Sequence, residues 1–147
     1  MLVCAAALLV ACSAQVTDTA NNRDPTTAAS SSQLQNTYWK LMTLNNVSVE
    51  SPEGTRELHL ELNSEDLRVK GSSGCNSFMG AYELDGPKIT FSRVAGTMMA
   101  CAGDMSIERR ILEMLGSVRT WQISGKTLQL MDQAGTPIAT FESRDVN

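Results

Sequence analysis

Four cysteines and one histidine are the side chains of this 147-residue chain with the greatest capacity for covalent or metal chemistry. Cys4 and Cys12 lie in an apolar N-terminal stretch, whereas Cys75 and Cys101 lie in the longer, more polar part of the chain. Any Cys–His or Ser–His catalytic pair must use His59, because the chain has no other histidine. The candidate chemistries are therefore nucleophilic catalysis by Cys75 with His59, a disulfide, and a metal site.

The surroundings of His59 favour a histidine that faces solvent on a strand. It stands on the polar side of an alternating segment, and no third residue is placed to orient its imidazole. Glu57 and Glu61 fit the same solvated strand face, and Glu65 and Asp66 fit a turn. None of these carboxylates lies in apolar surroundings that would separate the pKa values of an acid–base pair. We therefore predict that the protein is not an enzyme and has no catalytic residues, cofactor or metal.

The N-terminal residues have the features of a sorting signal. Residues 1–11 carry no charge, are too few to span a bilayer, and end in small residues. The run Leu9-Val10-Ala11-Cys12 resembles a bacterial lipobox, in which the cysteine is acylated and becomes the first residue of the mature protein. An ordinary secretory signal, with Cys12 incidental, is the alternative. We expect a lipid anchor on Cys12 that attaches the protein to a membrane without a spanning helix.

The residue after Cys12 and the segment that follows indicate where the domain sits. Ser13, unlike Asp, allows sorting to the outer membrane, so we expect an envelope protein anchored at the periplasmic face of that membrane. Residues 12–33 are rich in Ser, Thr, Ala and Asn and contain no aromatic residue, which is typical of a flexible tether. We place the folded domain at residues 34–147.

If the domain is exported, Cys75 and Cys101 face an oxidising compartment, which favours disulfides. We predict that these two cysteines form one, which would join a loop in the middle of the chain to a segment before a helix. A metal site is less well supported because the chain lacks paired CxxC or histidine ligands, and a redox pair normally has CxxC spacing. Met98, Met99 and Met105 flank Cys101 and could hold copper(I), but we favour methionines that fill the core.

Residues 71–80, with the sequence GSSGCNSFMG, contain three glycines but match neither a P-loop nor a nucleophile elbow. We predict a compact loop that the disulfide fixes. Asn76, Ser77 and Phe78 are our candidate binding residues in this loop.

Composition fits a single globular domain and excludes several classes. Hydrophobic residues make up 42% of the chain and charged residues 19%, which excludes wholly disordered and fibrous proteins. Lys and Arg number 12 against 16 Asp and Glu, for a net charge of −4, and no basic cluster suggests a nucleic-acid partner. A membrane, reached through the lipid anchor, and an unidentified envelope protein or small ligand are the expected partners.

Hydrophobic alternation predicts that the elements positioning these residues are mostly strands. Residues 56–62 alternate strictly, with Leu58, Leu60 and Leu62 on one face. Similar alternation predicts strands at residues 37–44 and around four further pairs: Leu67 with Val69, Ile89 with Phe91, Leu128 with Leu130, and Ala139 with Phe141. Short strands at this spacing suggest an antiparallel meander or barrel.

One amphipathic helix is predicted at about residues 105–117. Ile107, Ile111, Leu115 and Val118 recur at helical spacing, and Gly116 lies where a left-handed C-terminal turn is easiest. The helix should pack on the sheet or close one end of a barrel. The fold class is therefore mainly β with one α-helix.

The order of several short motifs resembles the META domain of HslJ-like bacterial lipoproteins. The specific parts are Gly74-Cys75-Asn76 and Thr97-Met98-Met99-Ala100-Cys101. Other matching positions are Tyr38-Trp39-Lys40-Leu41, Gly80, Tyr82, Glu108, Trp121, Gly125, Leu128, Leu130, Asp132 and Phe141. The resemblance implies a small antiparallel β-barrel of lipocalin-like topology with one helix. It also implies a loose link to heat shock, envelope stress and antibiotic tolerance, and no catalytic residues.

The leading hypothesis is a non-enzymatic, lipid-anchored envelope protein that supports stress resistance by binding another envelope component near Asn76. A carrier of a small apolar ligand is the first alternative, because closed barrels can enclose one. The large inward-facing candidates, Leu58, Leu60, Leu62, Phe91, Leu128, Leu130 and Phe141, favour a filled interior instead. An inhibitor of a cell-wall hydrolase is the second alternative.

Overall fold

A computed structural model of the protein describes residues 32–101 and 105–145. The predicted signal peptide, Cys12 and nearly all of the tether lie outside these described residues. The strands are β1 (Tyr38–Leu44), β2 (Val47–Ser48), β3 (His59–Asn63), β4 (Arg68–Ser72), β5 (Ser77–Asp85), β6 (Lys88–Gly96), β7 (Thr120–Ser124), β8 (Thr127–Met131) and β9 (Pro137–Arg144). The helix is α1 (Ser106–Ser117).

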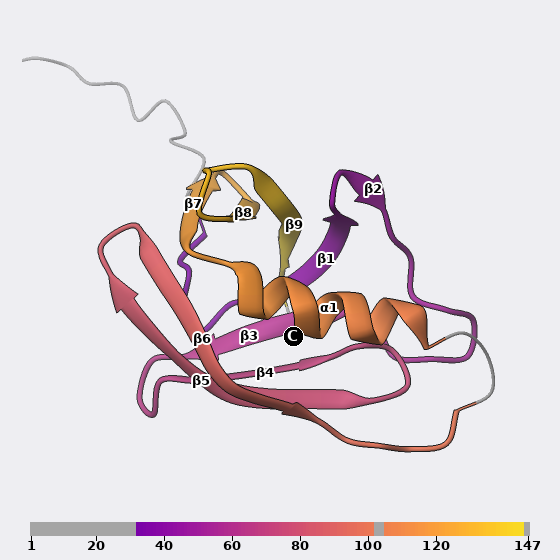
Figure 1. Ribbon diagram of the computed structural model, residues 1–147. Coiled ribbons are helices and arrows are strands. Elements are labelled where there is room, and N and C mark those ends of the chain that lie inside the picture. The colour runs from indigo at the N-terminus through magenta and orange to yellow at the C-terminus, as the bar shows by residue number, and fades with distance from the viewer. Residues whose placement is uncertain (1–31, 102–104, 146–147) are drawn as a thin grey trace, which may run out of the picture.

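The strands form one antiparallel sheet that closes on itself (Figure 1). From β3 to β9 each strand pairs with the next along the chain, and β1 pairs with both β3 and β9. The two-residue strand β2 lies outside this ring and pairs with the end of β1. Closure leaves fewer open strand edges that could pair with other chains. The predicted mainly β barrel with one helix is confirmed for the described part of the chain.

The predicted inward residues fill the barrel. Strand β3 buries Leu60 and Leu62 while its other residues are half-buried, as the alternation indicates. All seven large candidates are buried, namely Leu58, Leu60, Leu62, Phe91, Leu128, Leu130 and Phe141. Trp39 is fully buried and donates its indole Nε1–H to the carbonyl oxygen of Leu34 at 2.9 Å. The hydrophobic core therefore contains residues from both the N-terminal and the C-terminal part of the domain.

Several local predictions are wrong, and the first concerns Leu67. The alternation predicts that Leu67 points inward with Val69, but Leu67 lies in the β3–β4 turn at φ +52°, with 45% of its surface exposed. The side chain of Asn63 accepts hydrogen bonds from the backbone N–H groups of Glu65 and Asp66, which shapes that turn. The turn chemistry therefore outweighs the apolar preference of Leu67.

The second correction concerns residues 71–80, which are mostly strand and not loop. Gly71 and Ser72 end β4, and β5 begins at Ser77, so only residues 73–76 connect the two. Gly71 is needed inside a strand because a Cβ there would collide with the carbonyl oxygen of His59 and the ring of Phe78. Glycine here indicates close approach of the backbone to its neighbours.

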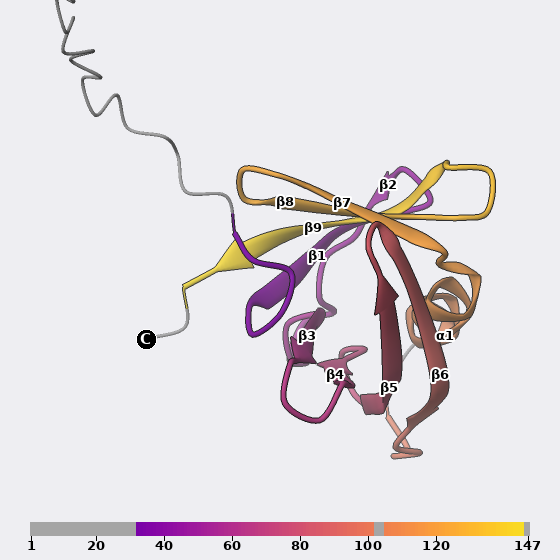
Figure 2. The same cartoon turned by 90° about the vertical axis from the view of Figure 1, so that its left-hand side faces the viewer.

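Helix α1 is confirmed with nearly the predicted bounds. It buries Ile111, Met114 and Leu115, and it lies beside β6 (Figure 2). In Figure 1 it crosses the barrel between β1 above and β6 below. The predicted left-handed turn at Gly116 is wrong, because Gly116 lies inside the helix and the residue that follows its end, Val118, is extended with φ −62° and ψ 138°. In the part of the chain that the structure describes, no helix has the length and apolar character needed to cross a membrane.

The ring of strands is least continuous between β6 and β7. Only one residue pair, Lys88 with Thr120, is in register there, whereas β7 and β8 share five pairs. Backbone hydrogen bonds from Ile89 to Arg119 and from Trp121 to Pro87, each 3.0 Å, complete this contact. Beyond Ile89, β6 runs beside α1 and leaves β7. We call the β6–β7 contact the seam of the barrel.

Candidate functional site

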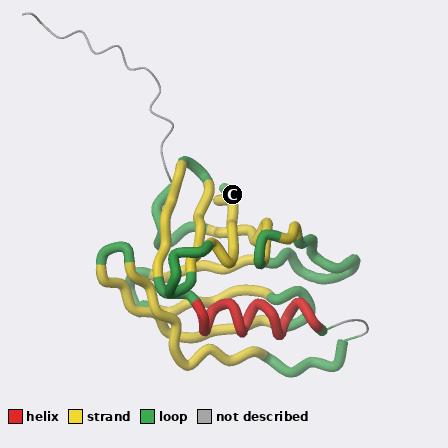
Figure 3. The backbone as a smooth tube through the Cα atoms, turned by 45° about the horizontal axis from the view of Figure 1, so that its top comes forward, coloured by secondary structure: helices red, strands yellow, loops and turns green. Residues whose placement is uncertain are grey.

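Cys75 and Cys101 form a disulfide, as the sequence predicts, with their Cα atoms 6.3 Å apart. The bond joins the short β4–β5 connection to the segment between β6 and α1. Long loops gather at this end of the barrel, where α1 begins (Figure 3). Because the bond closes a loop of 26 residues, the chain-entropy model gives it about 3.5 kcal/mol of stabilisation. Because Cys75 is in this disulfide, it has no free thiol to act as a nucleophile with His59.

Asn76 joins three segments of the chain from a buried position, with 1% of its surface exposed. Its Nδ2 donates to Oε2 of Glu108 in α1 at 2.9 Å. Its Oδ1 accepts from the hydroxyl of Thr97 at 2.7 Å and from the backbone N–H of Met99 at 2.9 Å. The amide thus ties the start of α1 to the segment that carries Cys101.

The backbone around Asn76 is equally constrained. Its carbonyl oxygen accepts from both the N–H and the hydroxyl of Ser73, at 2.9 and 3.0 Å. The Thr97 hydroxyl also accepts from the N–H of Ser77, and the N–H of Thr97 donates to the carbonyl oxygen of Ser77. Arg56 donates from Nη2 to the carbonyl oxygen of Cys75 at 3.0 Å. The disulfide, Asn76 and these contacts hold residues 97–101, which we call the stapled loop.

The three predicted binding residues do not share an exposed surface. Asn76 and Phe78 are buried, and Phe78 belongs to the hydrophobic core of the barrel. Ser77 is half-buried, and its backbone pairs with Thr97. Their side chains therefore shape this end of the barrel, and a partner that docks here must contact other residues.

The large exposed side chains of the stapled loop are two methionines, which lie between exposed Thr97 and Ala100. Met98 is 98% exposed and Met99 is 61% exposed, so the interpretation of these two as core filler is wrong. Met105, just before α1, is half-buried. Two apolar side chains thus stand in solvent on a backbone that a disulfide and Asn76 fix in place.

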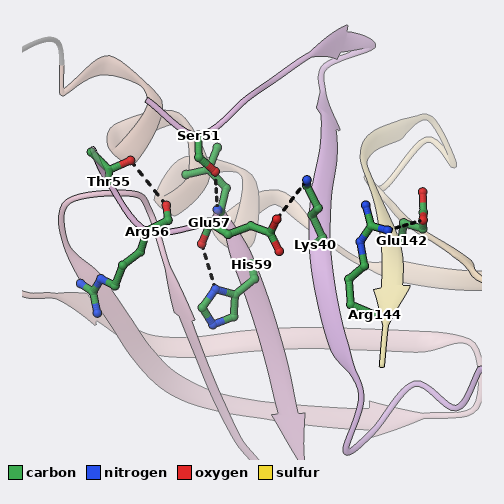
Figure 4. Close-up of polar contacts among 9 residues, drawn as sticks. Lys40, Ser51, Thr55, Arg56, Glu57, His59, Glu142 and Arg144 are labelled. Carbon is green, nitrogen blue, oxygen red and sulfur yellow. Dashed lines mark hydrogen bonds and ion pairs between the residues drawn. The ribbon is translucent and has the colours of Figure 1, made fainter. Parts of the chain in front are cut away.

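A second group of polar residues lies on the outer face of β1 and β3 (Figure 4). Lys40 forms a 3.0 Å ion pair with Glu57, and Nδ1 of His59 lies 2.9 Å from the carbonyl oxygen of Glu57. The imidazole of His59 stacks on the Tyr38 ring, with 4.3 Å between ring centroids. His59 is therefore a strand histidine held by its neighbours, with 19% of its side chain exposed.

Tyr38 is the titratable group that this arrangement perturbs. Burial, followed by the charge of Glu57, a hydrogen bond to Glu57 and the charge of Glu61, raises the pKa of Tyr38 from 10.0 to about 12. Each cause favours the neutral phenol over the phenolate. The hydroxyl consequently keeps its proton to a higher pH than a tyrosine in water does.

The interior of the barrel is filled by its own side chains. The cavity between the sheet and α1 has a volume of about 10 Å³, and Leu41, Phe78, Ile111, Met114 and Phe141 are among its lining residues. That is about the space of one water molecule. Among the residues that the structure describes, this cavity cannot hold an apolar ligand without rearrangement.

The partners of Asn76 were not predicted from the sequence. Thr97 and Glu108 match the motif order of the family, but nothing in the sequence pairs them with Asn76, and Glu108 lies 32 residues from it. The signal that could have identified them is the joint occurrence of Asn76, Thr97 and Glu108 in one motif order. No local pattern indicates that an asparagine in a glycine-rich segment will be buried.

Comparisons with known proteins agree with this fold. The model of the META domain family matches residues 32–145. A protein from Burkholderia xenovorans whose structure was determined by NMR is 26% identical, with a TM-score of 0.63 over 77% of this chain and 85% of that one. A second NMR structure is 25% identical, with a TM-score of 0.59 over 75% of this chain and 91% of that one. No curated protein sequence matches the chain.

Proposed function

The chain belongs to the META domain family, and from this premise we propose that it is a non-enzymatic envelope lipoprotein that binds another envelope protein through the stapled loop. The observation that carries the proposal is the exposure of Met98 and Met99 on a backbone fixed by Asn76 and the disulfide. Methionine side chains adapt to irregular apolar surfaces, and a rigid backbone reduces the entropy lost on binding. The stapled loop therefore has the properties of a docking element.

The setting of this binding follows from the N-terminal sequence. In this proposal Cys12 carries the acyl chains, and the domain lies at the periplasmic face of the outer membrane. The resemblance to HslJ-like lipoproteins supports a role in heat or envelope stress and in antibiotic tolerance. Binding of a partner protein by a membrane-anchored domain gives such a role a physical basis, because the anchor raises the local concentration of the domain.

The alternatives from the sequence receive less support. A carrier needs an internal cavity of several hundred Å³, whereas the cavity inside this barrel measures about 10 Å³. No separate feature favours an inhibitor of a cell-wall hydrolase, because such an inhibitor would use the same stapled loop.

Rescue of a deletion strain under heat or antibiotic stress tests the stapled loop. The variant Met98→Gln/Met99→Gln keeps side-chain length but removes the apolar contact surface, so we expect full expression, an intact disulfide and no rescue. Met79→Gln is the matched control, because Met79 is 56% exposed but lies on β5 outside the stapled loop. Rescue by the double variant at the level of wild type would overturn the proposal.

The anchor has a separate test. Mass spectrometry of the protein extracted from membranes should show acyl chains on Cys12, and Cys12→Ala should move the protein to the soluble fraction. A wild-type protein without acyl mass that still fractionates with the outer membrane would contradict the anchoring but not the docking surface.

A further inference from the structure

We propose that the barrel carries a second binding site, for a sugar phosphate, at the seam between β6 and β7. A surface pocket of about 560 Å³ opens there. Lys88 and Thr90 of β6 line one side, Arg119 and Thr120 line the other, and Asp132 and Gln133 contribute from the β8–β9 turn. The pocket shares no residue with the stapled loop, so the inference goes beyond the proposed function and does not depend on it.

The two cations of the pocket are available for an anionic ligand. Lys88 has no carboxylate within 4.0 Å of its ammonium among the residues that the structure describes. Arg119 donates from Nη1 to the carbonyl oxygens of Gly116 and Val118, at 2.9 and 2.6 Å. These bonds hold the guanidinium at the C-terminal end of α1 and leave Nε and Nη2 without an acceptor in the described chain. A phosphate monoester, with a charge of about −1.5 to −2 near pH 7, matches two cations of this kind.

The single carboxylate of the pocket does not cancel these charges. Oδ1 of Asp132 accepts hydrogen bonds from the backbone N–H groups of Ala134 and Thr136, both at 2.9 Å. The carboxylate is therefore already engaged in shaping its own turn. With Lys88 and Arg119 opposite one carboxylate, the pocket is locally positive in a protein whose net charge is −4.

The remaining polar groups suit the hydroxyls of a sugar ring. Thr90 and Thr120 project hydroxyls that have no partner among the described residues, and Gln133 adds an amide. Oδ2 of Asp132 can accept a sugar hydroxyl while Oδ1 keeps its turn contacts. The volume of about 560 Å³ exceeds what a bare phosphate ion needs and lies within the range of small-molecule sites.

Titration of the full-length protein by NMR tests the site, with glucose 6-phosphate, glucose and inorganic phosphate as probes. We expect glucose 6-phosphate to shift the amide signals of Lys88, Thr90, Thr120 and Gln133 in a saturable way, and to bind more tightly than either other probe. Binding should weaken as salt rises, because the Debye length falls from about 30 Å at 0.01 M to about 10 Å at 0.1 M. Equal binding of glucose would overturn the role of the cations, and equal binding of inorganic phosphate would overturn the role of the sugar.

Two variants make the assignment specific. Lys88→Gln should weaken binding of glucose 6-phosphate by roughly 10-fold or more, since it removes a charged hydrogen-bond donor. Lys126→Gln is the control, because it removes the same charge from the exposed β7–β8 turn. If the two variants lose the same affinity for glucose 6-phosphate, the effect comes from net charge alone and the site is overturned. The absence of any saturable shift at these amides would also overturn it.

The source of the sugar phosphate is decided by competition. If vesicles that contain a phosphorylated glycolipid displace glucose 6-phosphate from wild type but vesicles of phosphatidylcholine do not, the site takes a lipid headgroup. If neither kind of vesicle competes, the site takes a soluble sugar phosphate. Either result supports the chemistry of the pocket, and neither changes the outcome of the stapled-loop test.

Discussion

At the scale of single residues, Asn76 shows how a polar side chain can organise a β-barrel. One amide bridges α1, the stapled loop and the β4–β5 connection, with all three side-chain contacts between 2.7 and 2.9 Å. Because the side chain is buried, these bonds are protected from competition with water, and an unmade bond carries the full cost of desolvation.

The first prediction concerns Asn76→Ala. Removal of the amide leaves the N–H of Met99 and the carboxylate of Glu108 without their partner, so we expect the free energy of unfolding to fall by about 3 kcal/mol. Urea denaturation of the oxidised protein measures this change. Gln122→Ala, at an exposed position of β7, is the control and should cost less than about 0.5 kcal/mol. Similar losses in the two variants would show that the bridge contributes little.

Tyr38 supports a prediction about pH. Its pKa is about 12 in the folded protein and near 10 in the unfolded chain, so between these values only the unfolded chain loses the proton. The contribution of Tyr38 to stability is therefore full below pH 10 and is lost as the pH rises towards 12. The difference in unfolding free energy between wild type and Tyr38→Phe should shrink across this window.

The phenolate absorbance gives a direct check of the same pKa. Subtracting the titration of Tyr38→Phe from that of wild type isolates Tyr38. In Glu57→Gln the pKa of Tyr38 should fall below 12 but stay above 10, because burial, the largest cause, remains. Ionisation of Tyr38 near pH 10 in wild type would contradict the assignment.

At the scale of elements, the alternation of apolar residues predicted most strands and the helix, because burial of one face is encoded locally. It failed where the cause is not local. The segment 71–80 has few large apolar residues, and its strand character comes from pairing β4 with β5 around Gly71 and Phe78. Likewise, Asn76 and Glu108 become partners only after α1 docks beside β6.

Two glycines give opposite predictions for the same substitution. At Gly71 a Cβ meets the carbonyl oxygen of His59 and the Phe78 ring, so Gly71→Ala should destabilise the protein by about 2–3 kcal/mol. At Gly116 a Cβ has nothing within 4 Å, and the residue lies inside α1 without a positive φ. Gly116→Ala should therefore stabilise the protein by about 0.5–1 kcal/mol. Thermal unfolding of both variants measures the contrast, and a loss of stability in Gly116→Ala would contradict the helical geometry.

At the scale of the whole molecule, the interior of the barrel is filled. The large side chains that the sequence identifies occupy it, and the two sites proposed above, the stapled loop and the seam pocket, both lie on the surface. The sequence could predict the filled interior because it follows from residue size and alternation. It could not predict the seam pocket, because Lys88, Arg119 and Asp132 come from distant parts of the chain and no motif connects them.

The seam leads to a prediction about how the barrel opens. The β6–β7 contact has one residue pair in register, whereas β1 and β9 have six, so the seam is the weakest part of the ring. Regions with few hydrogen bonds open at a lower free energy than the global unfolding. In native-state hydrogen exchange, the amides of Ile89 and Trp121 should therefore exchange faster than those of Lys40 and Glu142, which lie opposite each other in the β1–β9 ladder. Equal protection at the two places would mean that α1 holds the seam as firmly as a continuous ladder would. A sugar phosphate that bridges Lys88 and Arg119 should raise the protection of Ile89 and Trp121 in wild type but not in Lys88→Gln.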